Sequence, residues 1–282
     1  MSNINVVADI GQNHQGDTFT ALHMANEAIT CGATVVKSQK RNPKSMPQEK
    51  YDQPYENPHS FGKTYGEHRE RLELPLASHH LLGVKCRERG ALFTDSVWDR
   101  ESLQEVLALD LPYLKIPSAL NNAWEFLKAV AAEFKGPVHV SNGMTSLEDE
   151  KRLVKMFAGR IVLYACTSSY PAEFKDVKLL DIVRFGKEYG GDLLGVGFSG
   201  HHRGIALDVV AVAMGATWIE RHFTLDRTMK GSDHAASLEP PGLAKMCRDI
   251  RAVLMSLDYR NGVLDCERAA YEKLKGGKTH NG

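Results

Sequence analysis

The sequence predicts an α/β protein with the architecture of a (β/α)8 TIM barrel, a single domain with a short C-terminal helical tail. Short β-branched apolar runs alternate with longer stretches of helical periodicity through most of the 282 residues. Eight such pairs fit within about 250 residues, the typical length of this fold. A doubly wound sheet is the rival, but it usually has fewer strands, and no GxGxxG motif follows the first apolar run.

Each predicted strand is a short run rich in β-branched and other apolar residues. In chain order the strands are 4–10, 34–39, 91–97, 112–118, 137–142, 160–167, 193–199 and 217–223. The segments that follow them have helical period and give helix candidates near 18–30, 78–89, 101–108, 123–133, 146–157, 177–188, 204–214 and 241–256. This strict alternation is what favours a parallel barrel.

Capping residues support several of the predicted helices. Ser146 precedes a first turn with two acidic residues, and Asp99 precedes the helix near 101–108. Ser237 or Glu239 can cap the last helix of the barrel.

We expect residues 1–257 to form the barrel domain and residues 258–282 a linker-like tail. The stretch 40–77 is long, irregular and rich in proline, tyrosine, histidine and charge. It follows the second strand, so it is expected on the C-terminal face of the barrel, where long insertions usually are functional loops. In the tail, 265–275 predicts a short polar helix before a glycine-rich end.

Composition narrows the classes of partner. The formal net charge is zero, which gives no reason to expect nucleic acid or an anionic membrane surface as a partner. No run of 18 apolar residues is present, and the N-terminus lacks the basic and apolar regions of a signal peptide. The five cysteines are scattered and odd in number, without a CxxC. We therefore expect a cytoplasmic protein with reduced thiols.

Two lysines and several serines lie near the C-terminal ends of the predicted strands, where active sites of such barrels form. Lys37 and Lys115 each sit inside an apolar run. A lysine removed from water needs a partner, so the pair indicates an anionic ligand such as a phosphate or a carboxylate. The alternative is that polar residues at strand ends merely face solvent. The serines at these ends include Ser96, Ser118, Ser141 and Ser199.

Two histidines close adjacent predicted strands, and they can face one point at the mouth of the barrel. They are His201 and His222, and neutral imidazole is a common ligand of divalent transition ions. Two such ligands would leave room for water and substrate. A buried, hydrogen-bonded histidine in each strand is the equally open alternative. His202 is expected to point elsewhere, because neighbouring side chains of a strand alternate.

A polar loop follows the last strand. Asp233 and His234 lie in it, just before the last helix of the barrel. They can hold a sugar hydroxyl or a water at a metal, or they can form only a turn.

A series of motifs, taken together, resembles the sialic acid synthase (N-acetylneuraminate synthase) family of PEP-dependent nonulosonic acid synthases. The resemblance covers about residues 4 to 257 and is most specific in the last motif. The motifs are "ADIGQNHQGD", "VVKSQ", "KIPS", "VSNGMTSLEDE", "YACTSSYPA", "FSGHHRGI" and "IERHFTLDRTMKGSDHAASLEP". The resemblance implies a transferase that joins phosphoenolpyruvate (PEP) to a sugar aldehyde on a TIM barrel and releases phosphate. It also implies a divalent metal, often manganese, with magnesium or cobalt as alternatives.

Site residues follow from matching positions in these motifs. The metal ligands match His201 and His222, and the acceptor-sugar positions match Tyr170 and Asp233. Asp9 stands where the family usually has glutamate, and it is the candidate for orienting the water at the metal. The PEP-binding positions match Lys37, Lys115, Ser118, Ser141 and Ser199, with Ser96 in place of the usual threonine. Lys115 is expected to act together with Asp9 and the two histidines as catalytic machinery.

Three departures from the family pattern stand out. Leu120 replaces a glutamate that binds acceptor hydroxyls, and Gly200 replaces an aspartate. The sequence ends at residue 282, so we expect the C-terminal antifreeze-like domain, through which the family forms homodimers, to be lacking, leaving only the tail helix to pair two barrels. All three departures are expected to affect the acceptor side, so the acceptor is expected not to be standard N-acetylmannosamine.

Two other functions stay open. A sugar-phosphate aldolase on the same barrel would use Lys115 as a Schiff-base nucleophile. A non-catalytic sugar-binding relative would have lost turnover through the departures at Asp9, Leu120 and Gly200.

Overall fold

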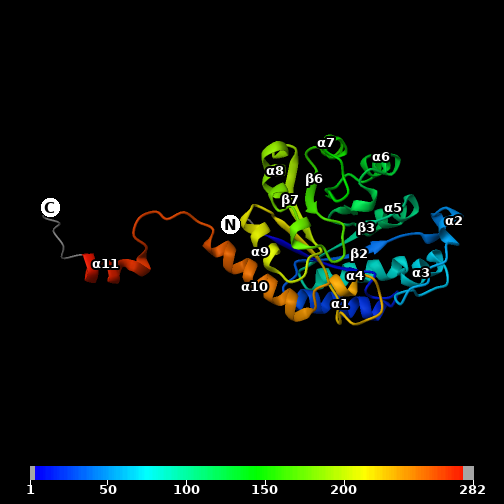
Figure 1. Ribbon diagram of the computed structural model, residues 1–282, viewed down its shortest axis with the longest axis horizontal. Coiled ribbons are helices and arrows are strands. Elements are labelled where there is room, and N and C mark those ends of the chain that lie inside the picture. The colour runs from blue at the N-terminus through cyan, green and yellow to red at the C-terminus, as the bar shows by residue number, and fades with distance from the viewer. Residues whose placement is uncertain (1–3, 276–282) are drawn as a thin grey trace.

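The computed structural model describes residues 4–275, and its centre is a closed barrel of eight parallel strands (Figure 1). Its strands are β1 (Asn5–Gly11), β2 (Val35–Lys40), β3 (Leu92–Val97), β4 (Leu114–Ile116), β5 (Val138–Ser141), β6 (Ile161–Cys166), β7 (Leu193–Gly200) and β8 (Trp218–His222). All eight predicted strands are confirmed, and β1 pairs with β8 to close the sheet. β4 is shorter than predicted because Pro112 and Pro117, which have no backbone N–H to donate, flank it.

Helices cover the outside of the barrel in the predicted order. They are α1 (Thr18–Thr30), α4 (Leu76–Glu88), α5 (Arg100–Val106), α6 (Trp124–Glu133), α7 (Leu147–Met156), α8 (Leu180–Tyr189), α9 (Ala206–Ala213) and α10 (Pro240–Ser256). The predicted caps at Asp99 and Ser146 are confirmed, since each side chain accepts a backbone N–H of the first turn. The predicted cap of α10 is wrong. Glu239 precedes that helix, but its carboxylate accepts the N–H of Arg227 instead.

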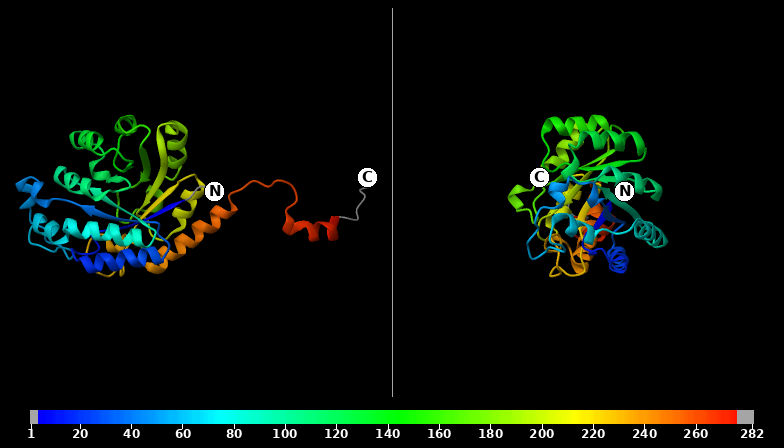
Figure 2. Two further views of the ribbon diagram at one scale, coloured as in Figure 1. Left: turned by 180° about the vertical axis from the view of Figure 1, so that it is seen from behind. Right: turned by 90° about the vertical axis from the view of Figure 1, so that its right-hand side faces the viewer.

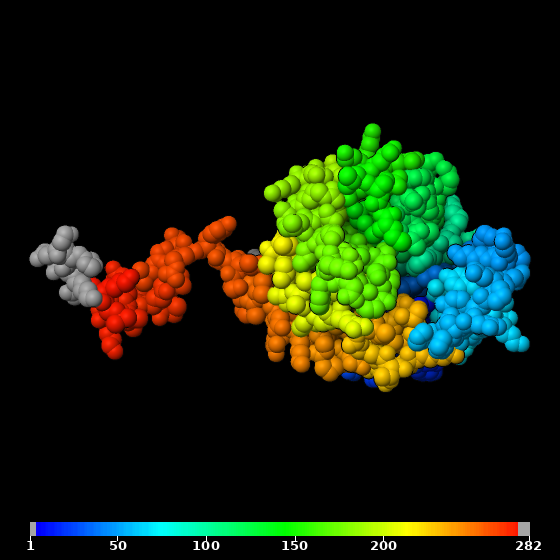
Figure 3. All heavy atoms as spheres, viewed as in Figure 1, coloured from blue at the N-terminus to red at the C-terminus, as the bar shows by residue number. Residues whose placement is uncertain are grey.

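The stretch 40–77 was expected to be irregular. The part of it that connects β2 to α4, residues 41–75 (segment 41–75), contains two helices, α2 (Gln48–Tyr51) and α3 (Tyr65–Leu72). A capping box starts α3, because the Thr64 hydroxyl accepts the Glu67 N–H and the Glu67 carboxylate accepts the Thr64 N–H. Gly66 packs on the ring of Tyr51, where a Cβ would lie 2.2 Å from a ring carbon. This segment stands beside one end of the barrel (Figure 3).

The other end of the barrel interior is closed by aromatic side chains. Tyr113 stacks on His139 with ring centroids 3.6 Å apart, and Trp218 meets His139 edge-on at 4.4 Å. Val7 and Val35 fill the same layer. Because this floor is packed, the interior is open to ligands only at the carboxyl ends of the strands. The main apolar core lies between the strands and the surrounding helices.

The tail extends away from the barrel, at the end opposite to segment 41–75 (Figures 1 and 2). The short polar helix predicted over 265–275 is confirmed as α11 (Arg268–Lys275), preceded by a 3-10 turn. The glycine-rich end, 276–282, lies outside the described residues. Within residues 4–275, no helix combines the length and apolar character needed to cross a bilayer.

Acidification is expected to destabilise the protein through His14, which is buried beside His79. Burial is the main cause that lowers the pKa of His14 to about 3, and the His79 charge lowers it further, while Asp17 opposes both. The unfolded state then binds more protons below pH 6.5, so stability present above 6.5 is lost as the pH falls. The contribution is about 1.4 kcal/mol per pH unit, and urea unfolding between pH 7 and 5 measures it.

The variant His14→Asn should flatten this pH dependence, while His80→Asn, at an exposed position, should leave it unchanged. Equal slopes for the wild type and His14→Asn would contradict the assignment.

Candidate active site

A cavity of about 270 Å³ opens at the carboxyl ends of the strands. All side chains predicted for catalysis, PEP, acceptor and metal line it: Asp9, Lys37, Ser96, Lys115, Ser118, Ser141, Tyr170, Ser199, His201, His222 and Asp233. The structure thus brings together residues from all eight strands or the loops that follow them. A larger hollow of about 440 Å³ lies beside α4 and the N-terminal end of β3, and it contains none of these residues.

Both predicted lysines are buried, and each has a carboxylate partner. Lys37 Nζ lies 2.5 Å from Asp9 Oδ2 and donates to Ser96 Oγ at 2.8 Å. Lys115 Nζ lies 2.6 Å from Glu220 Oε1, which also accepts from Ser199 Oγ at 3.2 Å. These partners supply the compensation that a buried ammonium needs.

The pKa values of the two lysines shift in opposite directions, because Lys37 is near both Asp9 and Glu220, whereas Lys115 has Glu220 and the opposing charge of Lys37. Burial acts most strongly on the pKa of Lys37 and lowers it, but Asp9 and Glu220 together outweigh burial and raise it overall. For Lys115, burial lowers the pKa and Glu220 offsets only part of that effect. Burial raises the pKa of Glu220, but the two lysines bring it down to about 2. Glu220 is therefore ionised at neutral pH, and its carboxylate offsets part of the effect of burial on Lys115.

The two predicted histidines face each other across one side of the cavity, with ring centroids 5.5 Å apart. His201 Nδ1 donates to the carbonyl of Thr167 at 2.8 Å, which leaves its Nε2 free for a ligand. Burial, reinforced by His222, lowers the pKa of His201 to about 3, so this imidazole is neutral. His222 lies between Asp9 and Asp233, each 3.8 Å away, and its Nδ1 has no hydrogen-bond partner.

These imidazoles meet the chemical needs of a divalent metal, since both are buried and each keeps one ring nitrogen free of hydrogen bonds. No group of three or more His, Cys, Asp or Glu side chains positioned for a metal occurs in residues 4–275. A metal here would therefore have two protein ligands, and its remaining positions would go to water and substrate.

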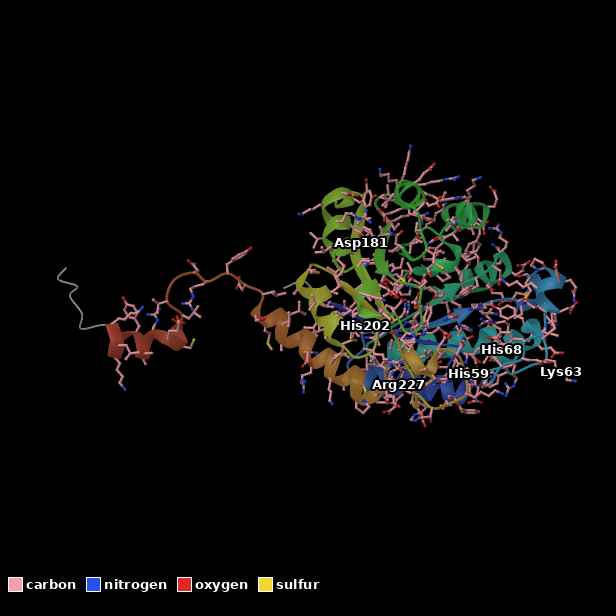
Figure 4. All side chains as sticks on the ribbon, in the orientation of Figure 1. His59, Lys63, His68, Asp181, His202 and Arg227 are labelled. Atoms are coloured by element: carbon pink, nitrogen blue, oxygen red, sulfur yellow. The ribbon has the colours of Figure 1, made fainter. Side chains whose placement is uncertain are left out.

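His202 points away from the cavity, as predicted. It lies 3.4 Å from Asp208, and Arg221 donates to its carbonyl in the layer outside the strands. Figure 4 labels His202 near β7 and places His59 and His68 in segment 41–75.

The loop after β8 places its two polar residues differently. Asp233 reaches the cavity, whereas His234 is buried and bonds Thr224 through Nδ1 at 2.7 Å.

Leu120 and Gly200 were both expected to alter the acceptor pocket. This expectation is wrong, because neither residue lines the cavity. Leu120 packs against the main core, and Ala119 and Met144 line the cavity there instead. Gly200 faces outward, since a Cβ at that position would lie 2.9 Å from Phe198 and 3.0 Å from His202. Side chains of a strand alternate, so Gly200 has the orientation opposite to that of Ser199 and His201.

Two arginines in the cavity were missed. Arg41 follows β2 directly, and Arg69 comes from α3, the helix that was not predicted. The Arg41 guanidinium lies 3.4 Å from the ring centroid of Trp98, which also lines the cavity. A charged residue directly after a strand was a sequence signal for Arg41, whereas Arg69 reaches the site only through the folding of segment 41–75.

Comparison with known proteins gives consistent relationships. The family model described as the NeuB family matches residues 24–261. The N-acetylneuraminate-9-phosphate synthase of Homo sapiens is 39% identical over 274 residues, which cover 95% of this chain and 76% of that protein. The N,N'-diacetyllegionaminic acid synthase of Legionella pneumophila is 32% identical, covering 87% and 71%.

Among solved structures, the N-acetylneuraminic acid synthetase of Leptospira borgpetersenii superimposes with a TM-score of 0.80 at 26% identity, covering 98% of this chain and 93% of that chain. Its barrel is the architecture found here. The named homologues are synthases of N-acetylneuraminate 9-phosphate, N,N'-diacetyllegionaminic acid and pseudaminic acid. With a family model that spans most of the barrel and relatives above 30% identity, the chain belongs to the NeuB family.

Proposed function

We propose that this chain condenses PEP with a sugar aldehyde, giving a 3-deoxy-2-ulosonic acid of the sialic acid type and inorganic phosphate. The observation that carries the proposal is the convergence of Lys37, Lys115, His201 and His222 on one cavity at the carboxyl ends of the strands. Membership of the NeuB family supports the same reaction.

PEP is assigned to the part of the cavity that holds the lysines and the serine hydroxyls. Lys37 and Lys115 would bind its carboxylate and phosphate groups, and an arriving anion would share them with Asp9 and Glu220. The hydroxyl donors proposed for PEP are Ser96, Ser118, Ser141 and Ser199. Holding PEP in this way supplies proximity and orientation rather than acid–base chemistry.

The reaction balances without a redox partner. Carbon 3 of PEP forms a bond to the aldehyde carbon, and the aldehyde oxygen becomes a hydroxyl. Water adds at carbon 2 of PEP, and the bond from carbon 2 to the phosphate oxygen then breaks, which releases inorganic phosphate. Asp9, beside His222, is proposed to orient water, although its carboxylate is shared with Lys37 and with the backbone N–H of Gly11.

His201 and His222 would hold a divalent metal, for which we propose Mn²⁺, with Mg²⁺ or Co²⁺ as alternatives. Bound there, a divalent metal supplies Lewis-acid polarisation of a carbonyl oxygen. Tyr170, whose ring centroid lies 4.2 Å from that of His201, and Asp233 are proposed to contact the acceptor. That the acceptor is not standard N-acetylmannosamine stays a prediction, because Leu120 and Gly200, the residues that suggested it, do not line the cavity.

The aldolase alternative is decided by experiment at Lys115. Its pairing with Glu220 at 2.6 Å favours the ammonium, whereas burial lowers its pKa towards the free amine that a Schiff-base nucleophile needs.

The purified protein should release phosphate from PEP when a panel of aldoses is supplied with Mn²⁺, EDTA should stop the release, and added Mn²⁺ should restore it. Borohydride should trap no carbonyl substrate on the chain. Full activity on N-acetylmannosamine alone would overturn the prediction about the acceptor. Trapping on Lys115 would favour the aldolase, and calorimetric binding of sugar without PEP would favour the non-catalytic protein.

Location in the cytoplasm, the lack of nucleic-acid and membrane partners, and a homodimer all stay predictions. So does the division of the chain at residue 257.

A further inference from the structure

The two histidines proposed to hold the metal lie directly beyond the point where β7 and β8 stop pairing. The last paired residues of these strands are Gly200 and Arg221, and His201 and His222 follow them in the chain. A backbone ladder fixes the distance between two strands only over the residues that it pairs. The separation of the two imidazoles, whose ring centroids lie 5.5 Å apart, therefore depends on what holds the chain after Gly200.

The side chain of Arg221 continues the connection between β8 and the turn after β7. Its Nη2 donates to the carbonyl of His202 at 2.8 Å, and its Nη1 donates to the carbonyl of Gly204 at 2.9 Å. His202, labelled in Figure 4, directly follows His201 in the chain. Because His222 faces the cavity and side chains of a strand alternate, Arg221 makes these bonds on the outside of the barrel.

The surroundings of Arg221 hold its guanidinium in one orientation. Arg221 is 1% exposed, and the fully buried Asp208 of α9 accepts a hydrogen bond from its Nη1 at 2.6 Å. This carboxylate offsets the cost of removing the guanidinium charge from water. A planar guanidinium that bonds a carboxylate and two carbonyls at once has little freedom to rotate. Arg221 therefore connects β8, the turn after β7 and α9 at fixed positions.

Other contacts of His201 orient its ring but do not connect it to β8. Its Nδ1 donates to the carbonyl of Thr167 at 2.8 Å, and its own carbonyl accepts the N–H of Ala172 at 3.0 Å. Both partners belong to the segment that follows β6. Arg221 supplies a connection from the residues after His201 to β8, the strand that carries His222.

We propose that Arg221 is a positioning residue of the metal site. By fixing the turn after β7 to β8, it sets the distance between His201 and His222 at which one divalent ion can bind both. The inference rests on the proposed function for the presence of a metal at these histidines. A site with two protein ligands gains affinity when both nitrogens are already in place, because ordering them on binding costs free energy.

Calorimetric titration of the EDTA-treated chain with MnCl2 tests the proposal. Arg221→Lys keeps a positive charge beside Asp208 but lacks the planar group that bonds both carbonyls. The Kd for Mn²⁺ should rise by about 10- to 100-fold, the usual effect of removing a group that holds metal ligands in place. The Kd for PEP without metal should stay within about twofold, because Asp9 and Glu220 hold the lysines proposed for PEP.

Arg160→Lys is the matched control for a general loss of stability. The Arg160 guanidinium also donates to carbonyls of a neighbouring segment, those of Ala131, Phe134 and Gly136. It directly precedes β6, at the end of the barrel opposite to the cavity. This variant should lose stability in urea, as Arg221→Lys does, yet bind Mn²⁺ as the wild type does. Equal weakening of Mn²⁺ binding by both variants would make Arg221 a general structural residue and overturn the proposal.

Gly204→Ala gives a second test, which does not depend on whether Arg221→Lys folds. Gly204 is exposed and has a φ of +79°, and a Cβ there would have no atom within 4 Å. The variant should fold, but alanine disfavours this φ, so the carbonyl that Arg221 bonds should shift. Mn²⁺ should then bind about threefold to tenfold more weakly. Gly159→Ala, at φ +78° and equally free of contacts, is its control and should bind Mn²⁺ normally.

The outcomes separate this inference from the proposed function. Wild-type affinity for Mn²⁺ in either Arg221→Lys or Gly204→Ala would overturn the inference and leave the proposed function standing. A wild type that binds no Mn²⁺ would remove the proposed metal site, and the inference with it. If the wild type binds Mn²⁺ but releases no phosphate from PEP, the proposed reaction fails, and the Kd values of the variants still decide the role of Arg221.

Discussion

Lys115→Met should reduce phosphate release from PEP by orders of magnitude and lower the free energy of unfolding by about 3–5 kcal/mol. Methionine fills much of the space of lysine but leaves Glu220 Oε1 buried without its partner at 2.6 Å. An uncompensated buried carboxylate is what makes removal of one member of such a pair costly. The loss of a cation at the PEP site should reduce kcat/KM for PEP by about a thousandfold. Urea unfolding and a phosphate-release assay measure the two effects separately.

The double variant Lys115→Met with Glu220→Gln separates stability from activity. Removing both charges should bring the free energy of unfolding back to within about 1 kcal/mol of the wild type, because no unpaired charge is left in the barrel. Activity should stay lost, since the cation is still missing. Turnover of PEP at the wild-type rate by Lys115→Met would contradict the assignment of this lysine to PEP.

His222→Ala should lose binding of Mn²⁺ and reduce kcat/KM by about a hundredfold to a thousandfold, corresponding to several kcal/mol of lost stabilisation. The reason is that His222 and His201 are the two imidazoles in the cavity with a free ring nitrogen. Calorimetric titration with MnCl2 measures metal binding independently of turnover. Circular dichroism should show an intact barrel, because His222 lies at the open end of its strand.

His80→Ala, at an exposed position on α4, serves as the histidine control and should bind Mn²⁺ as the wild type does. Wild-type affinity for Mn²⁺ in both His201→Ala and His222→Ala would remove the proposed metal site.

Most of the barrel could be predicted because its signals are local. Each strand run is marked by composition and each helix by its period, and caps such as Asp99 and Ser146 depend on residues within one turn. These local signals did not lead to a prediction of the helices in segment 41–75, although the Thr64–Glu67 capping box was present in the sequence. Proline and charge dominate its composition, and its helix α3 is stabilised by packing of Gly66 against Tyr51, a contact no local pattern reveals.

The positions of the site residues divide in the same way. Lys37, Lys115, His201 and His222 could be assigned to one cavity because parallel strands of a barrel end on the same face. The orientation of Gly200 followed from strand alternation and was overlooked. Leu120 lies in a 3-10 turn after β4, where no simple period decides which side chain faces the cavity.

By itself, the sequence determined the order of eight strands and helices and the polar residues that the strand ends bring to one face. Periodicity is a pattern among neighbouring residues, so it can be recognised without knowledge of the rest of the chain. Only the tertiary structure decided the partners of the buried charges and the arrival of Arg69 at the cavity. Lys115 and Glu220 lie 105 residues apart, and Arg69 reaches Gln12 across 57 residues. Burial and ion pairing depend on which distant segments pack together, and packing is settled by the whole chain at once.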